Sequence, residues 1–316
     1  MNGIAQLLWR RHASRVGYHM PLWHPGDKRH YGLGYLPDAR KTRAFQIDSR
    51  AVHASAPIVD GGLVDFRWST VIDQNNCGSC TGHGTANALY TSHNAAGVPL
   101  PSFPSPRIGY GIVREIELPS ASAPLTDSGA MPSDLVAVVN KWGIAPIGTG
   151  ASYPSPRGYL SDVDETNVNI KPGLLDLETA GLLLQLTPLR IDESSPDFGA
   201  QISASIQAKA AMGVGIFVDT TNFMQWDPSS GPIKTINTND PQGGGHWLEL
   251  DYIYLLDGAP IVGGENSWSK DWAAPSGAVA SPFWRPGGWE MTLDCLVGVC
   301  SDCLGFPAGV IGKAAA

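Results

Sequence analysis

The stretch QNNCGSCTGHG, residues 74–84, places two cysteines three positions apart and then continues into small side chains. Cys80 in this stretch is compatible with three kinds of site: a catalytic nucleophile, one end of a disulfide, or a metal ligand. Each kind needs different partners, namely a base, a second cysteine or further ligands. The remainder of the sequence therefore has to distinguish them.

The composition indicates a globular protein with many loops. The chain has 316 residues, of which 43% are hydrophobic and 16% charged, with 37 glycines and 25 prolines spread along it. This length supports one large domain or two small ones. No apolar run reaches the roughly 18–20 residues of a membrane span. The start, MNGIAQLLWRRH, is unlike a secretory signal, because its arginines follow a short apolar run. Localisation is therefore left open, with cytoplasmic synthesis as the default expectation.

Charge is unevenly distributed along the chain. Residues 1–50 carry nine Lys and Arg against three Asp and Glu, whereas the remaining residues carry 12 against 26, and the net charge is −8. The acidic body is not expected to bind nucleic acid, because it would repel phosphate. The basic leader either folds onto its own domain, which we favour, or binds a partner.

The sequence after Cys80 suits a nucleophile. A cysteine reacts as the thiolate, so its pKa has to be lowered, for example by a helix N-terminus or an adjacent histidine. CTGHGTANALYTSHNAAG, residues 80–97, predicts a helix with closely packed small residues that ends at Gly97. Cys80 would lie at its positive end. Gln74, six residues earlier, either is an ordinary loop amide or donates a hydrogen bond to an oxyanion together with the Cys80 N–H.

A base is offered by QGGGHWLELDYIYLLDG, residues 242–258, which predicts a buried strand headed by His246. Taken alone, this histidine is more consistent with a structural role. GGENSWSKDW, residues 263–272, adds Asn266 and Trp268. The amide would fix the tautomer of an imidazole, and the indole would shield that hydrogen bond from water.

The order of these motifs resembles that of the papain-like cysteine peptidases. The resemblance covers about residues 60–293. DQNNCGSC (73–80) resembles their nucleophile loop, and DSGAMPSDLVAVVNKWGIAP (127–146) resembles their glycine-bearing substrate loop and the helix after it. GVGIFVDTTNFMQWDPSSGPI (213–233) resembles the strand and turn before the histidine. Several weak motifs in the right order make a specific match.

This resemblance implies an α+β fold with two lobes: a helical left lobe, a β-barrel-like right lobe, and the active site in the cleft between them. It implies a cysteine-type peptidase acting on a peptide or protein substrate, without a metal or cofactor. Cys80 would be the nucleophile, His246 the acid and base, Asn266 the orienting residue and Gln74 the oxyanion donor. The substrate-binding residues would be Ser128, Gly129, Met131, Gly245 and Trp268, with Gly244 beside them.

Two residues depart from the usual pattern of the family. Thr81 stands where many members have Trp or Tyr, and Ser269 replaces the usual glycine after Asn-Ser-Trp. Thr81 and the leader sequence YGLGYLPDARKTRAF (31–45) are closer to bacterial and viral branches. They leave the substrate class open.

We divide the chain into a basic leader (1–55), a peptidase domain (56–293) and a cysteine-containing C-terminal tail (294–316). The leader either crosses the cleft as an inhibitory pro-segment or is a permanent extension, which we favour.

Two alternatives to a peptidase stay open: a catalytically silent papain-like scaffold that binds a partner, and an enzyme that transfers non-peptide acyl groups with the same triad. The tail cysteines are free, bridged or metal-bound: Cys295, Cys300 and Cys303.

Overall fold

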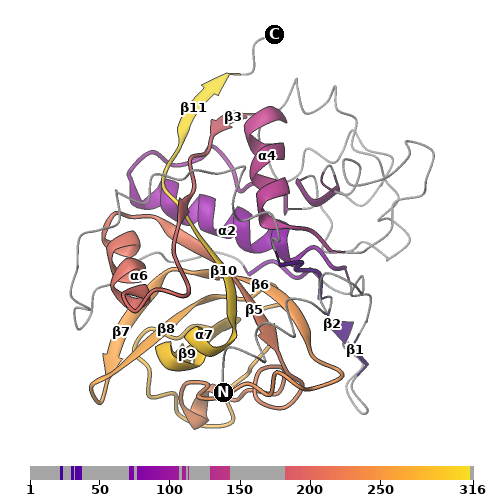
Figure 1. The fold of residues 1–316 in the computed structure, drawn as a ribbon, viewed down its shortest axis with the longest axis vertical. Helices are drawn as coiled ribbons and strands as arrows, with labels where there is room; N and C mark the ends of the chain where they lie inside the picture. Colours follow the sequence, from indigo (N-terminus) through magenta and orange to yellow (C-terminus); the bar gives the residue numbers. More distant parts are fainter. Residues whose placement is uncertain are drawn as a thin grey trace.

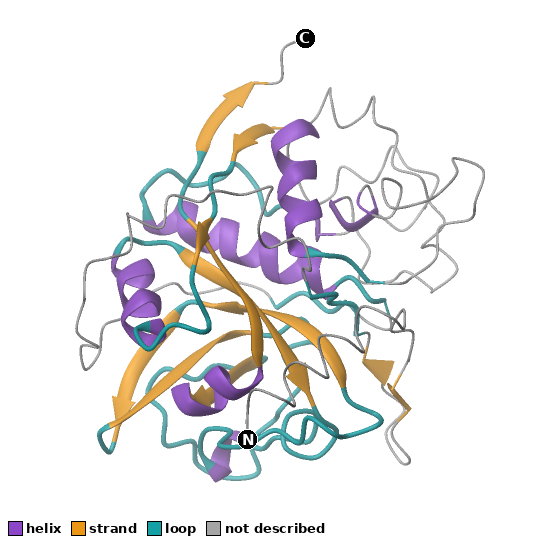
Figure 2. Cartoon of the chain, viewed as in Figure 1, coloured by secondary structure: helices purple, strands orange, loops and turns teal. Residues whose placement is uncertain are grey.

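The structure is a computed structural model. It describes residues 22–23, 30–31, 33–37, 71–74, 77–106, 109–111, 113, 129–142 and 182–313. The expected α+β class is confirmed: the helices at residues 80–95 and 132–142 lie on one side of the described chain, and most of the antiparallel strands lie on the other together with two shorter helices (Figures 1 and 2). The helices are α2 (Cys80–Ala95), α4 (Pro132–Trp142), α6 (Phe198–Gln207) and α7 (Leu293–Val299), with a short 3-10 helix, η4 (Pro228–Ser230).

The strand-rich lobe contains two antiparallel sheets. The larger sheet has the order β4 (Leu189–Arg190), β10 (Cys300–Phe306), β5 (Ala211–Val218) and β6 (Gly244–Leu250). The smaller sheet has the order β7 (Tyr252–Leu256), β8 (Ala259–Glu265) and β9 (Gly288–Thr292). Two short pairs complete the described strands: β1 (Leu22–Trp23) with β2 (His30–Tyr31), and β3 (Leu182–Gln185) with β11 (Val310–Lys313).

The buried strand predicted from His246 onward is present, but it is divided between the two sheets. Strand β6 ends at Leu250 and β7 begins at Tyr252. Between them lies Asp251, whose buried carboxylate binds Arg285 with a nitrogen–oxygen distance of 2.5 Å. Both strands are buried where they meet Asp251, so burial does not mark the break between them.

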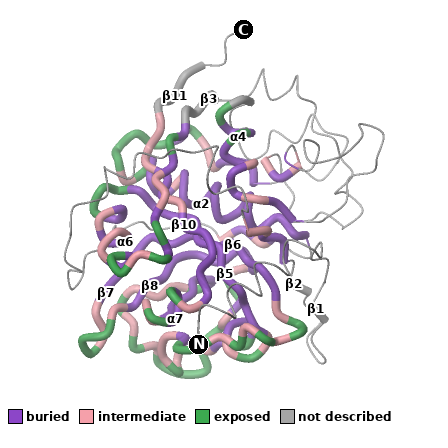
Figure 3. The backbone as a smooth tube through the Cα atoms, viewed as in Figure 1, coloured by how far each residue is buried: buried purple, intermediate pink, exposed green. Residues whose placement is uncertain are grey.

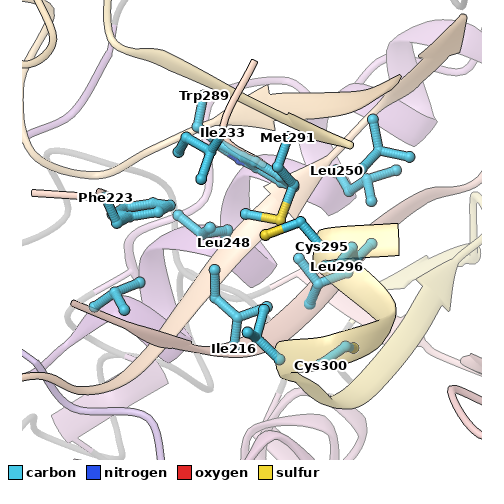
Figure 4. Close-up of a cluster of buried hydrophobic side chains, with 14 of the residues drawn as sticks. Ile216, Phe223, Ile233, Leu248, Leu250, Trp289, Met291, Cys295, Leu296 and Cys300 are labelled. Atoms are coloured by element: carbon cyan, nitrogen blue, oxygen red, sulfur yellow. The ribbon is translucent and has the colours of Figure 1, made fainter. Parts of the chain in front are cut away.

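The core of this lobe lies between the sheets and α7. Figure 4 shows Ile216 of β5 and Leu248 of β6 facing Met291 of β9 and Leu296 of α7. Full burial of one such side chain stabilises a fold by about 1.5–3 kcal/mol. Every residue of β5 and β6 is buried, and exposed backbone is concentrated at the rim of the lobe (Figure 3). Strands β5 and β6 are therefore held rigidly.

Helix α2 packs against β5 and β6, at the boundary between the lobes. Its small residues permit this close approach: a Cβ at Gly84 would lie 2.7 Å from Cδ1 of Trp247. The helix ends as predicted, because Gly97 adopts a φ of 72°, which favours glycine. Helix α4 coincides with the helix predicted from PSDLVAVVNKW.

The C-terminal segment contributes to the larger sheet. Strand β10 lies between β4 and β5, and α7 packs on β8 and β9. The part of the predicted tail that forms α7 and β10 is therefore integrated with the strand-rich lobe, whereas β11 pairs with β3, which packs on α4. Within the described ranges, no helix has both the length and the apolar character needed to cross a membrane.

Candidate active site

Cys80 is the first residue of α2 and is fully buried. Its sulfur interacts with the backbone N–H groups of Gly34 and Trp247, so the start of the helix is held close to β6. Burial raises the pKa of Cys80 to about 11, and these N–H groups oppose the rise only in part. In this state Cys80 is a neutral thiol at neutral pH.

His246 lies in β6, next to Trp247, whose backbone N–H interacts with the Cys80 sulfur. Its Nε2 atom is 2.8 Å from Oδ1 of Asn266. The backbone N–H of Ser267 also donates to that Oδ1 atom, at 2.7 Å. An atom that accepts from an obligate donor is the amide oxygen, so Nε2 of His246 carries the proton. Nδ1 has no hydrogen-bond partner among the described residues and keeps its lone pair.

Aromatic rings enclose the His246–Asn266 pair. The Trp268 indole stacks on the imidazole, with ring centroids 4.3 Å apart and planes inclined by 20°. Phe223 approaches the same imidazole edge-on at 6.3 Å. Burial, followed by the nearby charge of His83, lowers the pKa of His246 to about 3, and the Asn266 hydrogen bond opposes this. The imidazole of His246 and the thiol of Cys80 are therefore both neutral at neutral pH.

Gln74 joins the cysteine loop to the loop that carries Asn266. Its backbone N–H donates to the carbonyl of Ser267 at 2.8 Å, and the Ser267 hydroxyl donates to Gln74 Oε1. Its Nε2 atom donates to the carbonyl of Cys77 at 2.7 Å. The side-chain amide of Gln74 therefore lies between the two loops, and its nitrogen has two hydrogens that it can donate.

A segment of the leader, Leu33–Pro37, runs between the two lobes. Ala130 pairs with it in the manner of a parallel strand: Ala130 N donates to Gly34 O at 2.7 Å, and Leu36 N donates to Ala130 O at 3.1 Å. Tyr35 N donates to Gly245 O at 3.3 Å. The main-chain groups beside Gly129 and at Gly245, predicted to bind substrate, therefore hold the protein's own chain.

Glycines make this approach possible. Gly129 adopts a φ of 78°, and a Cβ there would lie 2.2 Å from Gly34 O. A Cβ at Gly34 would collide with the carbonyl of Gly78. Thr81, one of the departures from the family pattern, donates its hydroxyl to Ala130 O at 3.1 Å. It therefore fastens the start of α2 to the strand-like loop at residue 130.

The predicted substrate residues are placed differently from one another. Ser128 lies outside the described residues, and Met131 is partly exposed at the start of α4. Trp268 is 1% exposed, and its ring faces His246.

None of the five cysteines, including Cys77 in the quoted stretch, forms a disulfide. Across the described ranges, no group of three or more His, Cys, Asp or Glu is arranged to hold a metal ion.

Sequence reasoning missed the surroundings of Tyr35. This side chain is 1% exposed, and its hydroxyl contacts Ser301 and Asp302 near the start of β10. A signal was present in β5, where Gly213 and Gly215 interrupt an otherwise apolar strand. Glycines inside a strand often mark close approach of another group. A Cβ at Gly215 would lie 2.2 Å from the Tyr35 ring.

Comparison with known proteins yields matches only at the level of structure. No protein-family model and no curated protein matches the sequence. Xylellain, a cysteine protease from Xylella fastidiosa, is 19% identical with a TM-score of 0.59, over 90% of this chain and 99% of that chain. ProCathepsin B S9 from Trypanosoma congolense is 14% identical with a TM-score of 0.54, over 90% and 86%.

A third match is to the cysteine protease and lectin-like domains of Cwp84, a surface layer associated protein of Clostridium difficile. It is 12% identical with a TM-score of 0.53, over 78% of this chain and 50% of that chain. At these identities the shared property is the fold. The match to xylellain agrees with the bacterial-type resemblance of the motifs. The chain therefore has the papain-like cysteine peptidase fold.

Proposed function

We propose that this protein is a cysteine-type peptidase that hydrolyses peptide bonds with Cys80, His246 and Asn266. One observation carries the proposal: the imidazole of His246 is fixed by Asn266 through Nε2, while Nδ1 keeps an available lone pair. The next residue, Trp247, touches the sulfur of Cys80 through its backbone N–H. A scaffold has no need for this combination of an oriented base and a thiol at a helix N-terminus.

The proposed reaction uses two proton transfers through His246. Cys80 gives its proton to Nδ1 of His246, and the thiolate attacks the carbonyl carbon of the scissile peptide bond. The Cys80 N–H and Nε2 of Gln74 donate hydrogen bonds to the oxyanion. His246 then protonates the leaving amine. A water molecule, deprotonated by His246, hydrolyses the thioester and restores the thiol.

In the described state the proposed enzyme is latent. Segment 33–37 bonds to Ala130 and Gly245, and the backbone N–H of Gly34 interacts with the Cys80 sulfur. Cys80 and His246 are buried and neutral in this arrangement, which disfavours the thiolate–imidazolium pair. A substrate that uses the same main-chain groups has to displace the segment, or the segment has to leave first.

The test compares the full chain with three variants: Tyr35→Ala, Cys80→Ala, and the two substitutions together. We expect Tyr35→Ala to loosen the segment and to release fluorescent peptides from labelled casein faster than the unsubstituted chain. Adding Cys80→Ala should abolish that release. Mass spectrometry after treatment with a peptidyl epoxide should locate the label on Cys80, and His246→Ala should prevent labelling.

Two results would contradict the proposal. Proteolysis that persists in the Cys80→Ala variants would mean that another nucleophile is responsible. Absence of proteolysis in Tyr35→Ala, with epoxide label spread evenly over the cysteines, would favour a binding scaffold. For the oxyanion role, Gln74→Ala is expected to lower kcat by about 10²- to 10³-fold with little change in KM. Gln74→Glu, which keeps the shape but removes the donor, should lower kcat similarly.

A further inference from the structure

The side chain of Tyr35 is enclosed by residues from three strands. We call its surroundings the Tyr35 site, made up of Gly215, Gly245, Trp247, Ser301 and Asp302. The ring packs on Trp247 with centroids 5.5 Å apart. Gly215 leaves the space that the ring fills, because a Cβ there would lie 2.2 Å from Cζ. The site therefore has the dimensions of a single aromatic side chain.

The far end of the Tyr35 site is polar. The Tyr35 hydroxyl donates to the carboxylate of Asp302, and its oxygen lies 2.6 Å from Oγ of Ser301. Ser301 is fully buried and Asp302 is 5% exposed, so both are shielded from water. Ser301 Oγ also contacts Gly215 O at 3.2 Å, which fixes its position. An occupant without a donor would deprive this buried carboxylate of one hydrogen bond.

The main chain around Tyr35 links the site to the nucleophile. Tyr35 N bonds to Gly245 O, its neighbours bond to Ala130, and Gly34 N–H reaches Cys80. Any extended peptide that uses the same groups places one side chain in the Tyr35 site, adjacent to the residue that lies at Cys80. Edge-strand capture of this kind derives affinity from the backbone and selectivity from side-chain pockets.

We propose that the Tyr35 site of the proposed peptidase selects peptides with tyrosine beside the residue at Cys80. Asp302 and Ser301 determine this selectivity by bonding to the phenol hydroxyl. Sites that bond to a substrate hydroxyl discriminate strongly against the analogue that lacks it, because their buried groups then lose a partner. This inference deepens the proposed function and rests on it.

The first test uses the full chain carrying Tyr35→Ala, so that the leader no longer fills the site. Peptide substrates are matched in pairs that differ only by Tyr or Phe at one position, with an Arg peptide alongside. We expect kcat/KM to favour Tyr over Phe by about tenfold or more at one position. Adding Asp302→Ala or Ser301→Ala should reduce that ratio by about tenfold.

The outcomes separate this inference from the proposed function. If no peptide is cleaved, the proposed function fails. If peptides are cleaved but Tyr and Phe are equivalent, or Arg is preferred, the proposed function survives and the tyrosine selectivity is wrong. Gly215→Leu, which fills the site, should slow turnover of both peptides.

A binding measurement tests the site without catalysis. A synthetic peptide with the sequence of residues 30–40 is titrated into the full chain carrying Tyr35→Ala and Cys80→Ala. The peptide should bind about tenfold more tightly than the same peptide with Phe in place of Tyr35. Equal affinities for the two peptides would overturn the inference, whatever the activity assays give.

Discussion

Nε2 of His246 lies 2.8 Å from Oδ1 of Asn266, and the backbone N–H of Ser267 donates to the same oxygen at 2.7 Å. The two contacts together determine the tautomer of the imidazole. Because Ser267 N–H can only donate, Asn266 presents its oxygen, and His246 has to be protonated on Nε2. Nδ1 is then the acceptor that a thiol proton requires. Asn266 is in this sense a positioning residue.

Replacing Asn266 by alanine should impair turnover without preventing folding. The imidazole would lose a hydrogen bond that strengthens when the ring is charged, a bond worth about 1.5–3 kcal/mol. We therefore expect kcat/KM to fall by about 10- to 150-fold in Asn266→Ala. Steady-state kinetics on a casein-derived peptide and the rate of Cys80 labelling should fall together.

Asn266→Asp is the matched variant for this prediction. Its carboxylate still accepts both donors, but a negative charge beside the ring favours the imidazolium and raises the pKa of His246. The acid limb of the pH–rate profile should then move to higher pH. A merely structural role for Asn266 would lower the yield of folded protein and leave the pH profile of the surviving enzyme unchanged.

The reactivity of Cys80 should depend steeply on pH in the unsubstituted chain. Burial raises the pKa of Cys80 to about 11, and the thiolate is the species that alkylates. The rate of iodoacetamide labelling should therefore rise about tenfold per pH unit between pH 7 and pH 10. In Tyr35→Ala, where water and reagent reach the pair, the rate should be higher at pH 7 and flatter with pH.

Peptide-level mass spectrometry can follow this reactivity with an internal reference. Burial raises the pKa of Cys295 to about 12, so Cys295 should label more slowly than Cys80 at each pH. A plateau for Cys80 between pH 5 and pH 7 in the unsubstituted chain would mean that the ion pair persists with the segment in place. The latent state proposed above would then be wrong.

Much of this arrangement could be predicted from local sequence because the local rules are strong. The helix at Cys80 begins and ends where its small residues and Gly97 indicate. The helix at residues 132–142 lies where the resemblance of residues 127–146 implied one. The His246 strand followed from its apolar run. These elements depend on neighbouring residues and on burial, which leave a period and a boundary in the sequence.

The Tyr35 site could not be predicted in the same way. Tyr35 and Asp302 are separated by more than 260 residues, and no periodicity connects them. The sheet order that brings β10 next to β5 is likewise non-local. The signal in the sequence was the pair of glycines inside a buried strand, Gly213 and Gly215. The break at Asp251 was also hidden, because its carboxylate is buried by pairing with Arg285 instead of being exposed.

Ser269 accounts for one departure from the family pattern. Its φ is 70°, in the left-handed region that favours glycine, which explains why glycine is usual at this position. Its hydroxyl accepts from Asp271 N at 3.2 Å and its carbonyl from Trp272 N at 3.3 Å. The side-chain bond offsets part of the backbone strain.

The close contact between α2 and β6 can be tested with two glycines. In Gly84→Ala the new Cβ would lie 2.7 Å from the Trp247 ring and 3.2 Å from the Leu248 backbone, so the helix has to shift. Overpacking of this kind costs about 1–3 kcal/mol. We expect a lower free energy of unfolding in urea and slower labelling of Cys80 at the start of the same helix.

Gly298→Ala is the matched control for Gly84→Ala, because Gly298 is also helical and a Cβ there meets nothing within 4 Å. Alanine should raise helix propensity at this position and stabilise the fold by about 0.5–1 kcal/mol. Equal effects of the two substitutions would show that α2 and β6 are not packed as described.

The buried carboxyl of Glu249 should make stability depend on pH. Glu249 is fully buried; its Oε2 accepts from Glu265 N at 2.9 Å and its Oε1 from Thr91 at 3.2 Å. Burial, and then the charge of Asp251, raises the pKa of Glu249 well above its ordinary value. The folded protein therefore keeps a proton that the unfolded chain loses above about pH 4.5, and stability falls as pH rises from there.

Glu249→Gln removes this titration and retains an oxygen that can accept the Glu265 N–H. We expect the Tm of Glu249→Gln to exceed that of the unsubstituted chain by a margin that grows from pH 5 to pH 8. Each kcal/mol of unfolding free energy that the substitution restores should raise Tm by about 2–4 °C. Asp271→Asn serves as the control, since the side chain of Asp271 is 70% exposed. If the margin for Glu249→Gln were constant across this range, Glu249 would have to be ionised in the folded protein. Its hydrogen bonds and Arg285 would then be strong enough to offset the cost of burying the charge.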